Sequence, residues 1–199
     1  MRTQPQDVIA KLEADNSRLA KEKILLDAMH EGLDEFFEGL KMCLDKLYTF
    51  GVKQVPTKDE VVAGQGCPWN VFKDLAVKLN KRELTGHNAR DAINLVMSSA
   101  TAEQWNGFYR RILIKDLRCG VSEKTVNSVA KKNKFGKYMV PVFTCQLAHD
   151  SANHEKKLVG EKMLEVKLDG VRTLAIAYPD GKVDMSVSYT HLTLPTNSS

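Results

Sequence analysis

The sequence predicts an α+β chain, in which a helical unit over residues 1–134 precedes a unit with β-strands over residues 135–187. Apolar residues recur with a helical period through the first two thirds, whereas β-branched residues become frequent after residue 135. A turn signal, Pro179-Asp180-Gly181, then separates two segments rich in β-formers. A length of 199 residues allows one large domain or two small ones.

The helices are predicted from their apolar faces. One or two short helices are expected between residues 7 and 30, and longer apolar faces follow. The first face consists of Leu33, Phe36, Phe37, Leu40, Leu44 and Leu47, and the second of Val71, Phe72, Leu75, Ala76 and Leu79. The third consists of Ala89, Ala92, Ile93, Val96 and Met97, and the fourth of Trp105, Phe108, Tyr109, Ile112 and Leu113. Trp69 and Trp105 are expected to anchor the core.

Helix ends are predicted from capping residues. Thr101 and Gln104 have the spacing of a capping box, which begins the fourth helix. Gly120 is expected to end that helix in a left-handed conformation. Ser122 then caps a further helix that runs to about Lys132.

Residues 51–68 contain glycines and prolines and are expected to be mostly connector. Thr57 and Glu60 have capping-box spacing, which predicts a short helical turn at Val61.

The pattern changes after Phe135. Residues 139–147 are extended in character, and residues 163–166 and 171–178 are predicted strands. The turn at Pro179-Asp180-Gly181 is expected to join the second of these strands to residues 183–187.

Composition excludes several classes of protein. No apolar run approaches the roughly 18 residues that span a membrane, and the N-terminus lacks the apolar core of a signal peptide. We therefore expect a cytosolic protein without a membrane partner. Its four cysteines form no Cys-x-x-Cys pair, which favours reduced thiols over zinc ligands, and its histidines show no metal-ligand spacing.

Charge is unevenly distributed along the chain. Residues 7–60 hold eight basic and twelve acidic side chains, whereas residues 81–137 hold twelve basic and five acidic ones. Such a basic segment attracts polyanions, because binding releases counterions from a nucleic acid. On charge alone, a solvated basic face and a nucleic-acid surface remain equal alternatives.

One segment contains the candidate catalytic residues. It reads Glu165-Val166-Lys167-Leu168-Asp169-Gly170-Val171-Arg172. Strand alternation places Glu165, Lys167 and Asp169 on one face. The spacing alone favours a surface ion pair, but burial and a neighbouring cation such as Arg172 would lower the pKa of Lys167 toward that of a nucleophile. The planar guanidinium of Arg172 also suits phosphate.

The pattern Lys-x-Asp-Gly-x-Arg resembles the signature of the covalent nucleotidyltransferases, which comprise ATP-dependent DNA ligases, RNA ligases and mRNA capping enzymes. The resemblance implies that Lys167 is the catalytic nucleophile that attacks the α-phosphorus of ATP with Mg²⁺. It implies further that Glu165, Asp169 and Arg172 help to bind the nucleotide.

A second segment, from Ile114 to Asn127, is similar to the Asp-Leu-Arg-x-Gly-x-Ser stretch of ligase DNA-binding domains. Residues 84–89 resemble another part of bacteriophage-type DNA ligases. Together the resemblances imply a helical DNA-binding domain followed by the first strands of an adenylation domain. The implied partner is nicked double-stranded DNA, and the implied setting is the cytosol of a bacterium or a phage-infected host, with the protein a monomer.

The DNA-binding residues are predicted around a tight turn between two helices. The amides at the start of the second helix suit a backbone phosphate, and the basic side chains before it suit a grip that does not read sequence. The predicted contacts are Arg111, Lys115, Arg118, Gly120, Ser122, Lys124 and Thr125. An ordinary packing corner with Gly120 and Ser122 as caps is the alternative.

The end of the chain departs from the ligase pattern. The family has a Ser-Arg-x-Gly element where residues 185–189 read Met-Ser-Val-Ser-Tyr. Residues 188–199 look like translated adaptor sequence, so we expect a non-native tail and a truncated adenylation domain that does not seal nicks by itself.

Two other functions stay open at this point. An RNA ligase or capping-type nucleotidyltransferase would share the lysine motif, but it generally lacks the helical leader. A non-catalytic DNA-binding protein with a ligase-like outline would keep the helices and make no use of Lys167.

Overall fold

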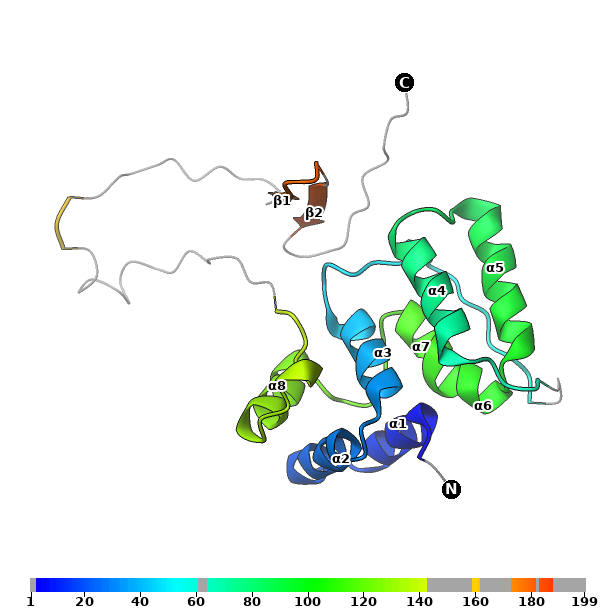
Figure 1. Ribbon diagram of the computed structural model, residues 1–199, viewed down its shortest axis with the longest axis horizontal. Coiled ribbons are helices and arrows are strands. Elements are labelled where there is room, and N and C mark those ends of the chain that lie inside the picture. The colour runs from blue at the N-terminus through cyan, green and yellow to red at the C-terminus, as the bar shows by residue number, and fades with distance from the viewer. Residues whose placement is uncertain (1–2, 61–63, 143–158, 162–172, 182, 188–199) are drawn as a thin grey trace. The chain divides into compact units, whose positions relative to one another are not determined.

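The computed structural model describes residues 3–60, 64–142, 159–161, 173–181 and 183–187 (Figure 1). The chain forms two compact units, Met1–Val142 and Phe143–Ser199. In the described part of the chain, no helix is long and apolar enough to cross a membrane.

The first unit is helical. In chain order its elements are α1 (Pro5–Ala14), α2 (Arg18–His30), α3 (Asp34–Leu44), α4 (Trp69–Asn80), α5 (Gly86–Ser99), α6 (Ala102–Gln104), a π-helical turn η1 (Trp105–Tyr109), α7 (Arg110–Leu113), α8 (Glu123–Lys132) and a 3₁₀ turn η2 (Gly136–Tyr138). Helix α3 packs against α7, α2 against α8, and α4 against α5 (Figure 1). The predicted helical unit is thus present.

The core of this unit is aromatic. Phe36, Phe72, Trp105 and Phe108 are fully buried, as the predicted apolar faces require. The rings of Phe72 and Tyr109 stack with their centroids 4.2 Å apart, so α4 and η1 are joined by close ring contacts. Trp105 is the buried anchor that the sequence predicts. Trp69 is only partly buried, and its indole N–H donates to the Glu38 carboxylate at 2.7 Å.

Two helices end earlier than the sequence predicts. The apolar face of α3 was expected to reach Leu47, but the helix ends at Leu44 because Asp45 has an extended ψ of 115°. The helix that contains η1 and α7 was expected to reach Gly120, but it ends at Leu113. The chain leaves it at Lys115, which has a left-handed φ of 59°.

The connector before α4 is tied to α5 by one buried lysine. The Lys58 ammonium donates to the carbonyl oxygens of Met97, Ser98 and Ala100 at 3.0, 2.8 and 2.5 Å. These carbonyls lie at the C-terminal end of α5, where the helix leaves acceptors without a helical partner. The helical turn predicted at Val61 lies outside the described residues.

Residues after α8 continue to pack on the helices. The Tyr138 ring stacks on Phe37 with the centroids 4.2 Å apart, and its hydroxyl donates to Asp34 at 2.7 Å. The Asn127 side-chain oxygen accepts from the Val140 N–H at 2.7 Å, and its amide nitrogen donates to the Val140 carbonyl at 2.9 Å. The compact unit therefore extends past residue 134, where the sequence placed its end, to Val142.

Within the described part of the second unit, β1 (Thr173–Ala177) and β2 (Val183–Val187) form an antiparallel hairpin. Ala175 pairs with Met185 at its centre. The predicted turn at Pro179-Asp180-Gly181 is confirmed, because the Gly181 N–H donates to the Tyr178 carbonyl at 3.0 Å and Gly181 has a φ of 83°. The strand predicted over residues 163–166 lies outside the described residues.

Candidate nucleic-acid interface

The candidate interface is built on the loop of residues 114–122, which joins α7 to α8. Three of its residues have positive φ angles: Lys115 at 59°, Arg118 at 53° and Gly120 at 63°. Two of these are not glycine, so the local conformation is held by contacts with the rest of the unit rather than by backbone preference. Three cationic side chains make those contacts, and they belong to Lys21, Arg111 and Lys115.

Lys115 faces the interior. Its ammonium donates to the carbonyl oxygens of Met42, Asp45 and Tyr48 at 2.8, 2.6 and 2.7 Å. These acceptors lie at and beyond the C-terminal end of α3, so Lys115 caps that helix. Burial lowers the pKa of Lys115 to about 8. All three of its donors are engaged, so Lys115 serves the fold of the loop.

Arg111 also braces the loop from within. Its guanidinium donates to the Leu117 carbonyl and to the Glu13 carboxylate, both at 2.9 Å, and to the Asn106 carbonyl at 3.1 Å. Only 17% of the Arg111 side chain is exposed. Arg111 therefore joins α1, η1 and the loop, whereas the sequence predicted a DNA contact.

Lys21 holds the loop from a third direction. The Lys21 ammonium, which comes from α2, donates to the Cys119 carbonyl at 2.7 Å in a buried position. A Cβ added to Gly120 would lie 2.5 Å from the Lys21 nitrogen. The left-handed φ of Gly120 thus favours glycine, as predicted, and a side chain there would also displace the Lys21 ammonium, which the sequence did not reveal.

The N-terminal end of α8 is open to solvent. The Ser122 hydroxyl accepts from the Thr125 N–H at 3.4 Å, so the predicted N-cap is confirmed. The side chains of Arg118, Ser122 and Lys124 are exposed beside this end. An anion placed there would meet backbone N–H groups and the positive end of the helix dipole.

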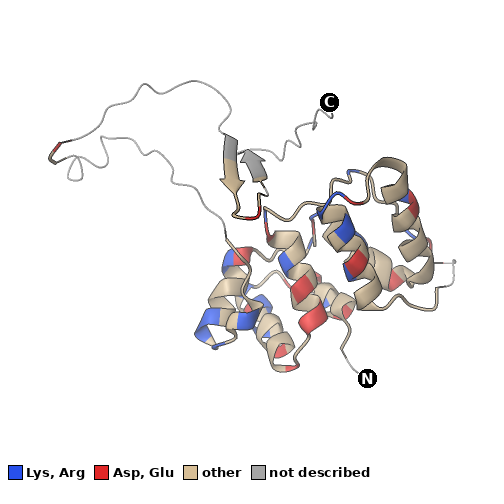
Figure 2. Cartoon of the chain, turned by 45° about the horizontal axis from the view of Figure 1, so that its top comes forward, with Lys and Arg blue, Asp and Glu red and all other residues tan. Residues whose placement is uncertain are grey.

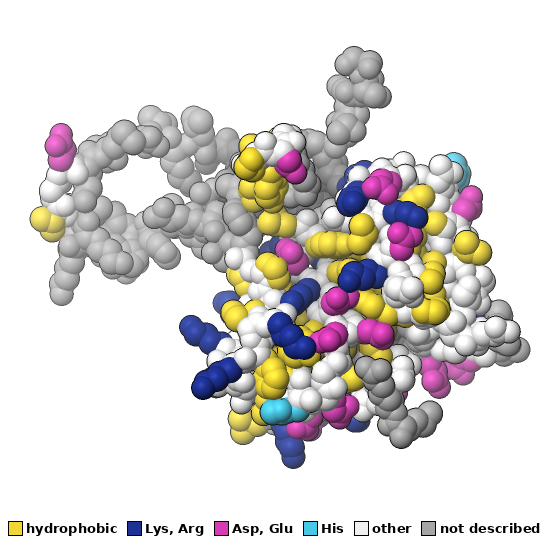
Figure 3. Space-filling model, in the orientation of Figure 1, with side chains coloured by type: hydrophobic (Ala, Val, Ile, Leu, Met, Phe, Trp, Pro, Cys, Tyr) yellow, Lys and Arg dark blue, Asp and Glu magenta, His cyan; other side chains and the backbone are white. Residues whose placement is uncertain are grey.

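Further basic side chains extend this surface along α8. Lys131, Lys132 and Lys134 are exposed, and none forms an ion pair with the described residues. Figure 2 shows how Lys and Arg gather on α8 and the turn after it, and in Figure 3 their side chains project over α8. Over α3 and α4, by contrast, basic and acidic groups are mixed. The name basic face is used below for Arg118, Lys124, Lys131, Lys132 and Lys134.

The three lysines at the end of α8 were not among the predicted contacts. Their signal was present in the sequence as a run of basic residues in the last helical turn and just beyond it. Of the seven predicted contacts, the structure places Arg118, Gly120, Ser122, Lys124 and Thr125 at or beside the open helix end. It places Arg111 and Lys115 beneath the loop.

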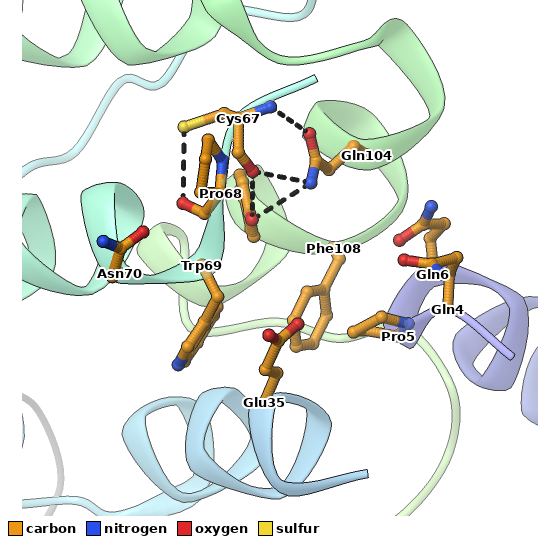
Figure 4. A pocket seen from close by; sticks show the side chains of 11 residues that line it. Gln4, Pro5, Gln6, Glu35, Cys67, Pro68, Trp69, Asn70, Gln104 and Phe108 are labelled. Atoms are coloured by element: carbon orange, nitrogen blue, oxygen red, sulfur yellow. Dashed lines mark hydrogen bonds between the residues drawn. The ribbon is translucent and has the colours of Figure 1, made fainter. Parts of the chain in front are cut away.

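A separate pocket of about 370 Å³ lies between the start of α1, α3 and the connector to α4 (Figure 4). Three of its lining residues bond one another: the Cys67 carbonyl accepts from the Gln104 amide and from the Tyr109 hydroxyl, both at 2.8 Å. Burial raises the pKa of Tyr109. These bonds fasten the connector to the helix that contains η1, so the pocket wall has a structural role.

The residues of the lysine motif, Glu165, Lys167, Asp169 and Arg172, lie outside the described residues. Among the described residues, no group of three or more His, Cys, Asp or Glu side chains is placed to hold a metal ion. The roles given to the motif by its resemblance to nucleotidyltransferases stay predictions.

Comparison with known proteins gives a match among solved structures only. No protein-family model and no curated protein matches the chain. Two solved structures, named Pmar-Lig_PreS3 and Pmar-Lig_Pre, each share 58% sequence identity with it at a TM-score of 0.74. The match covers 93% of this chain and 42% of each of those chains, so the chain spans less than half the length of either structure. The chain is therefore closely similar in sequence and fold to the matched part of structures whose names carry the abbreviation Lig.

Proposed function

We propose that the chain is part of an ATP-dependent DNA ligase, and that its helical unit binds the backbone of nicked duplex DNA. The observation that carries the proposal is the 58% identity over 93% of the chain to structures named Lig, which we read as ligase. The lysine motif supports it from within the sequence, since Lys167 and Arg172 stand in the order and spacing of the ligase signature.

The basic face supplies the means of binding. A ligase must accept any sequence, so its grip should fall on phosphates and not on base edges. Exposed Lys and Arg side chains provide such a grip, because each neutralised phosphate releases counterions. The amides at the start of α8 add hydrogen bonds to a phosphate from a fixed direction.

The chemical step is assigned to Lys167. In the proposed reaction its neutral amine attacks the α-phosphorus of ATP, a nitrogen–phosphorus bond forms, and the bond to the departing pyrophosphate breaks. The proton of the amine passes to solvent, and Lys167 then carries AMP. Magnesium bound with ATP would offset the negative charge that develops on the phosphate oxygens.

A chimera tests the proposal. Residues 1–187 of this chain would be joined to the remaining part of the structure named Pmar-Lig_Pre, and the product incubated with ATP labelled at the α-phosphate. We expect the label on Lys167 and sealing of a nicked duplex, and we expect Lys167→Ala to lose both while it keeps DNA binding. If Lys167→Ala retained the label or the sealing, Lys167 would not be the nucleophile. A chimera that binds DNA but never takes up the label would indicate a non-catalytic protein.

A further inference from the structure

Lys21 is a buried cation without a described carboxylate partner. Its residue is 9% exposed, and no ion pair within the described residues includes it. The acceptor that its ammonium meets is the Cys119 carbonyl, 98 residues away along the chain, at 2.7 Å. A buried charge is costly unless something in the fold solvates it, so this contact fixes the position of the loop strongly.

The contact also fixes the direction of the next amide. A trans peptide holds its C=O and N–H on opposite sides, and the described residues contain no cis bond. Because the Cys119 carbonyl points inward to Lys21, the N–H of Gly120 points outward. Cys119 is buried and Gly120 is exposed, in agreement with this orientation. No group in the described ranges accepts a hydrogen bond from the Gly120 N–H.

The outward amide lies two residues before Ser122, the N-cap of α8. The open N–H groups of the first turn follow Ser122. Gly120 and Ser122 are both exposed, on either side of the buried Val121, so the Gly120 amide lies close to the start of α8 along the chain. The same region carries the Arg118 and Lys124 side chains. A phosphate bound here would accept a hydrogen bond from the Gly120 N–H only if the peptide between Cys119 and Gly120 is already turned so that this N–H points outward.

We infer that Lys21 is a positioning residue for DNA binding, which turns the Gly120 amide toward a backbone phosphate without itself touching DNA. This inference rests on the proposed function of the helical unit. It predicts that loss of Lys21 weakens binding while the number of phosphates neutralised by the basic face stays the same.

Lys58 provides a matched control. It is 5% exposed, and among the described residues its ammonium also donates only to backbone carbonyls, those of Met97, Ser98 and Ala100. These acceptors belong to α5 and the residue after it, and not to the loop of residues 114–122. Lys58→Met should therefore lower the free energy of unfolding at least as much as Lys21→Met does. It should leave the orientation of the Gly120 amide unchanged.

The test measures affinity for a nicked duplex by fluorescence anisotropy over a range of salt concentrations, at a temperature where each variant is folded. Lys21→Met should weaken binding about tenfold, as expected for one lost hydrogen bond to a charged group, and should leave the salt dependence unchanged. Lys124→Met should instead reduce the slope of log affinity against log salt by about 0.9, the value for one lost phosphate contact. Lys58→Met should bind like the unaltered chain.

Four results would count against the inference or the proposed function. Lys21→Met with unchanged affinity would refute the inference alone, and so would Lys58→Met with an equal loss. Failure of the unaltered chain to bind DNA would instead refute the proposed function. A measurement that needs no variant completes the test: the backbone N–H signal of Gly120 in NMR spectra should shift on addition of the duplex, and a signal that stays still would overturn the inference.

Discussion

Gly39 on α3 lies directly against the ring of Phe108 in the π-helical turn η1. A Cβ added to Gly39 would lie 2.5 Å from the ring carbon Cζ of Phe108 and 2.6 Å from Cδ1 of Ile112. Both of these neighbours are fully buried. Gly39 therefore sets how closely α3 approaches the helix that leads into the loop of the candidate interface.

Gly39→Ala is expected to destabilise the helical unit. The added methyl group has no space, so the Phe108 ring and the Ile112 side chain must shift, and overpacking of this kind costs about 1–3 kcal/mol. Gly136→Ala is the matched control, because a Cβ there would meet nothing within 4 Å. Urea denaturation of both variants measures the difference, and a Gly39→Ala variant as stable as Gly136→Ala would show that the contact is not close in solution.

Lys134→Gly is expected to raise stability and lower DNA affinity together. Lys134 has a φ of 62° at the end of α8, where the Phe135 N–H donates to the Ala130 carbonyl at 2.8 Å. The left-handed conformation costs a residue with a Cβ roughly 1–2 kcal/mol, and glycine does not have this cost. The midpoint temperature of thermal unfolding should therefore rise. The salt slope of DNA binding should fall by about 0.9, as one phosphate contact is lost.

These two effects have opposite signs and are measured separately. A fall in stability would show that Lys134 makes a contact that outweighs its strained backbone. Unchanged DNA binding with raised stability would remove Lys134 from the basic face.

Lys115→Met is expected to destabilise the unit in a manner that depends on pH. The variant leaves the carbonyls of Met42, Asp45 and Tyr48 without their shared donor, at a cost of about 1–3 kcal/mol. The pKa of Lys115 is about 8 in the folded chain against an ordinary 10.5. Between about pH 8 and 10.5, Lys115 is protonated in the unfolded chain but not in the folded chain. Rising pH over this range therefore favours the folded state of the unaltered chain.

The deficit of Lys115→Met relative to the unaltered chain should therefore be constant below about pH 8. It should widen between about pH 8 and 10.5, by at most about 1.4 kcal/mol per pH unit. Denaturation curves at several pH values, taken for both proteins, give the difference directly. A deficit that shrinks over this range would mean that burial does not lower the pKa of Lys115.

The features that the sequence predicted correctly are local ones. Ser122 as N-cap, the left-handed Gly120 and the turn at Gly181 follow from the preferences of single residues and their immediate neighbours. The buried faces of α4, α5 and η1 follow from the helical period of their apolar residues. Val71 is the exception, because it was predicted on the face of α4 and is 45% exposed.

The features that sequence reasoning missed depend on long-range contacts. Lys115 was predicted to contact DNA because its charge was visible, but its acceptors lie 67 to 73 residues away. Its left-handed φ, which ends the helix early, is also uncommon for lysine. Lys21 gave no signal at all, because its role exists only once α2 packs beside the loop.

Binding of nicked duplex DNA by this chain, measured against salt concentration, tests the central claim most directly. We expect measurable affinity that falls steeply with salt and does not depend on base sequence. Replacing Lys131 and Lys132 by Gln should lower the slope by about 1.8, whereas the same change at the exposed Lys11 and Lys81, which lie outside the basic face, should leave it unchanged. Equal effects of the two double variants, or no binding by the unaltered chain, would contradict the account.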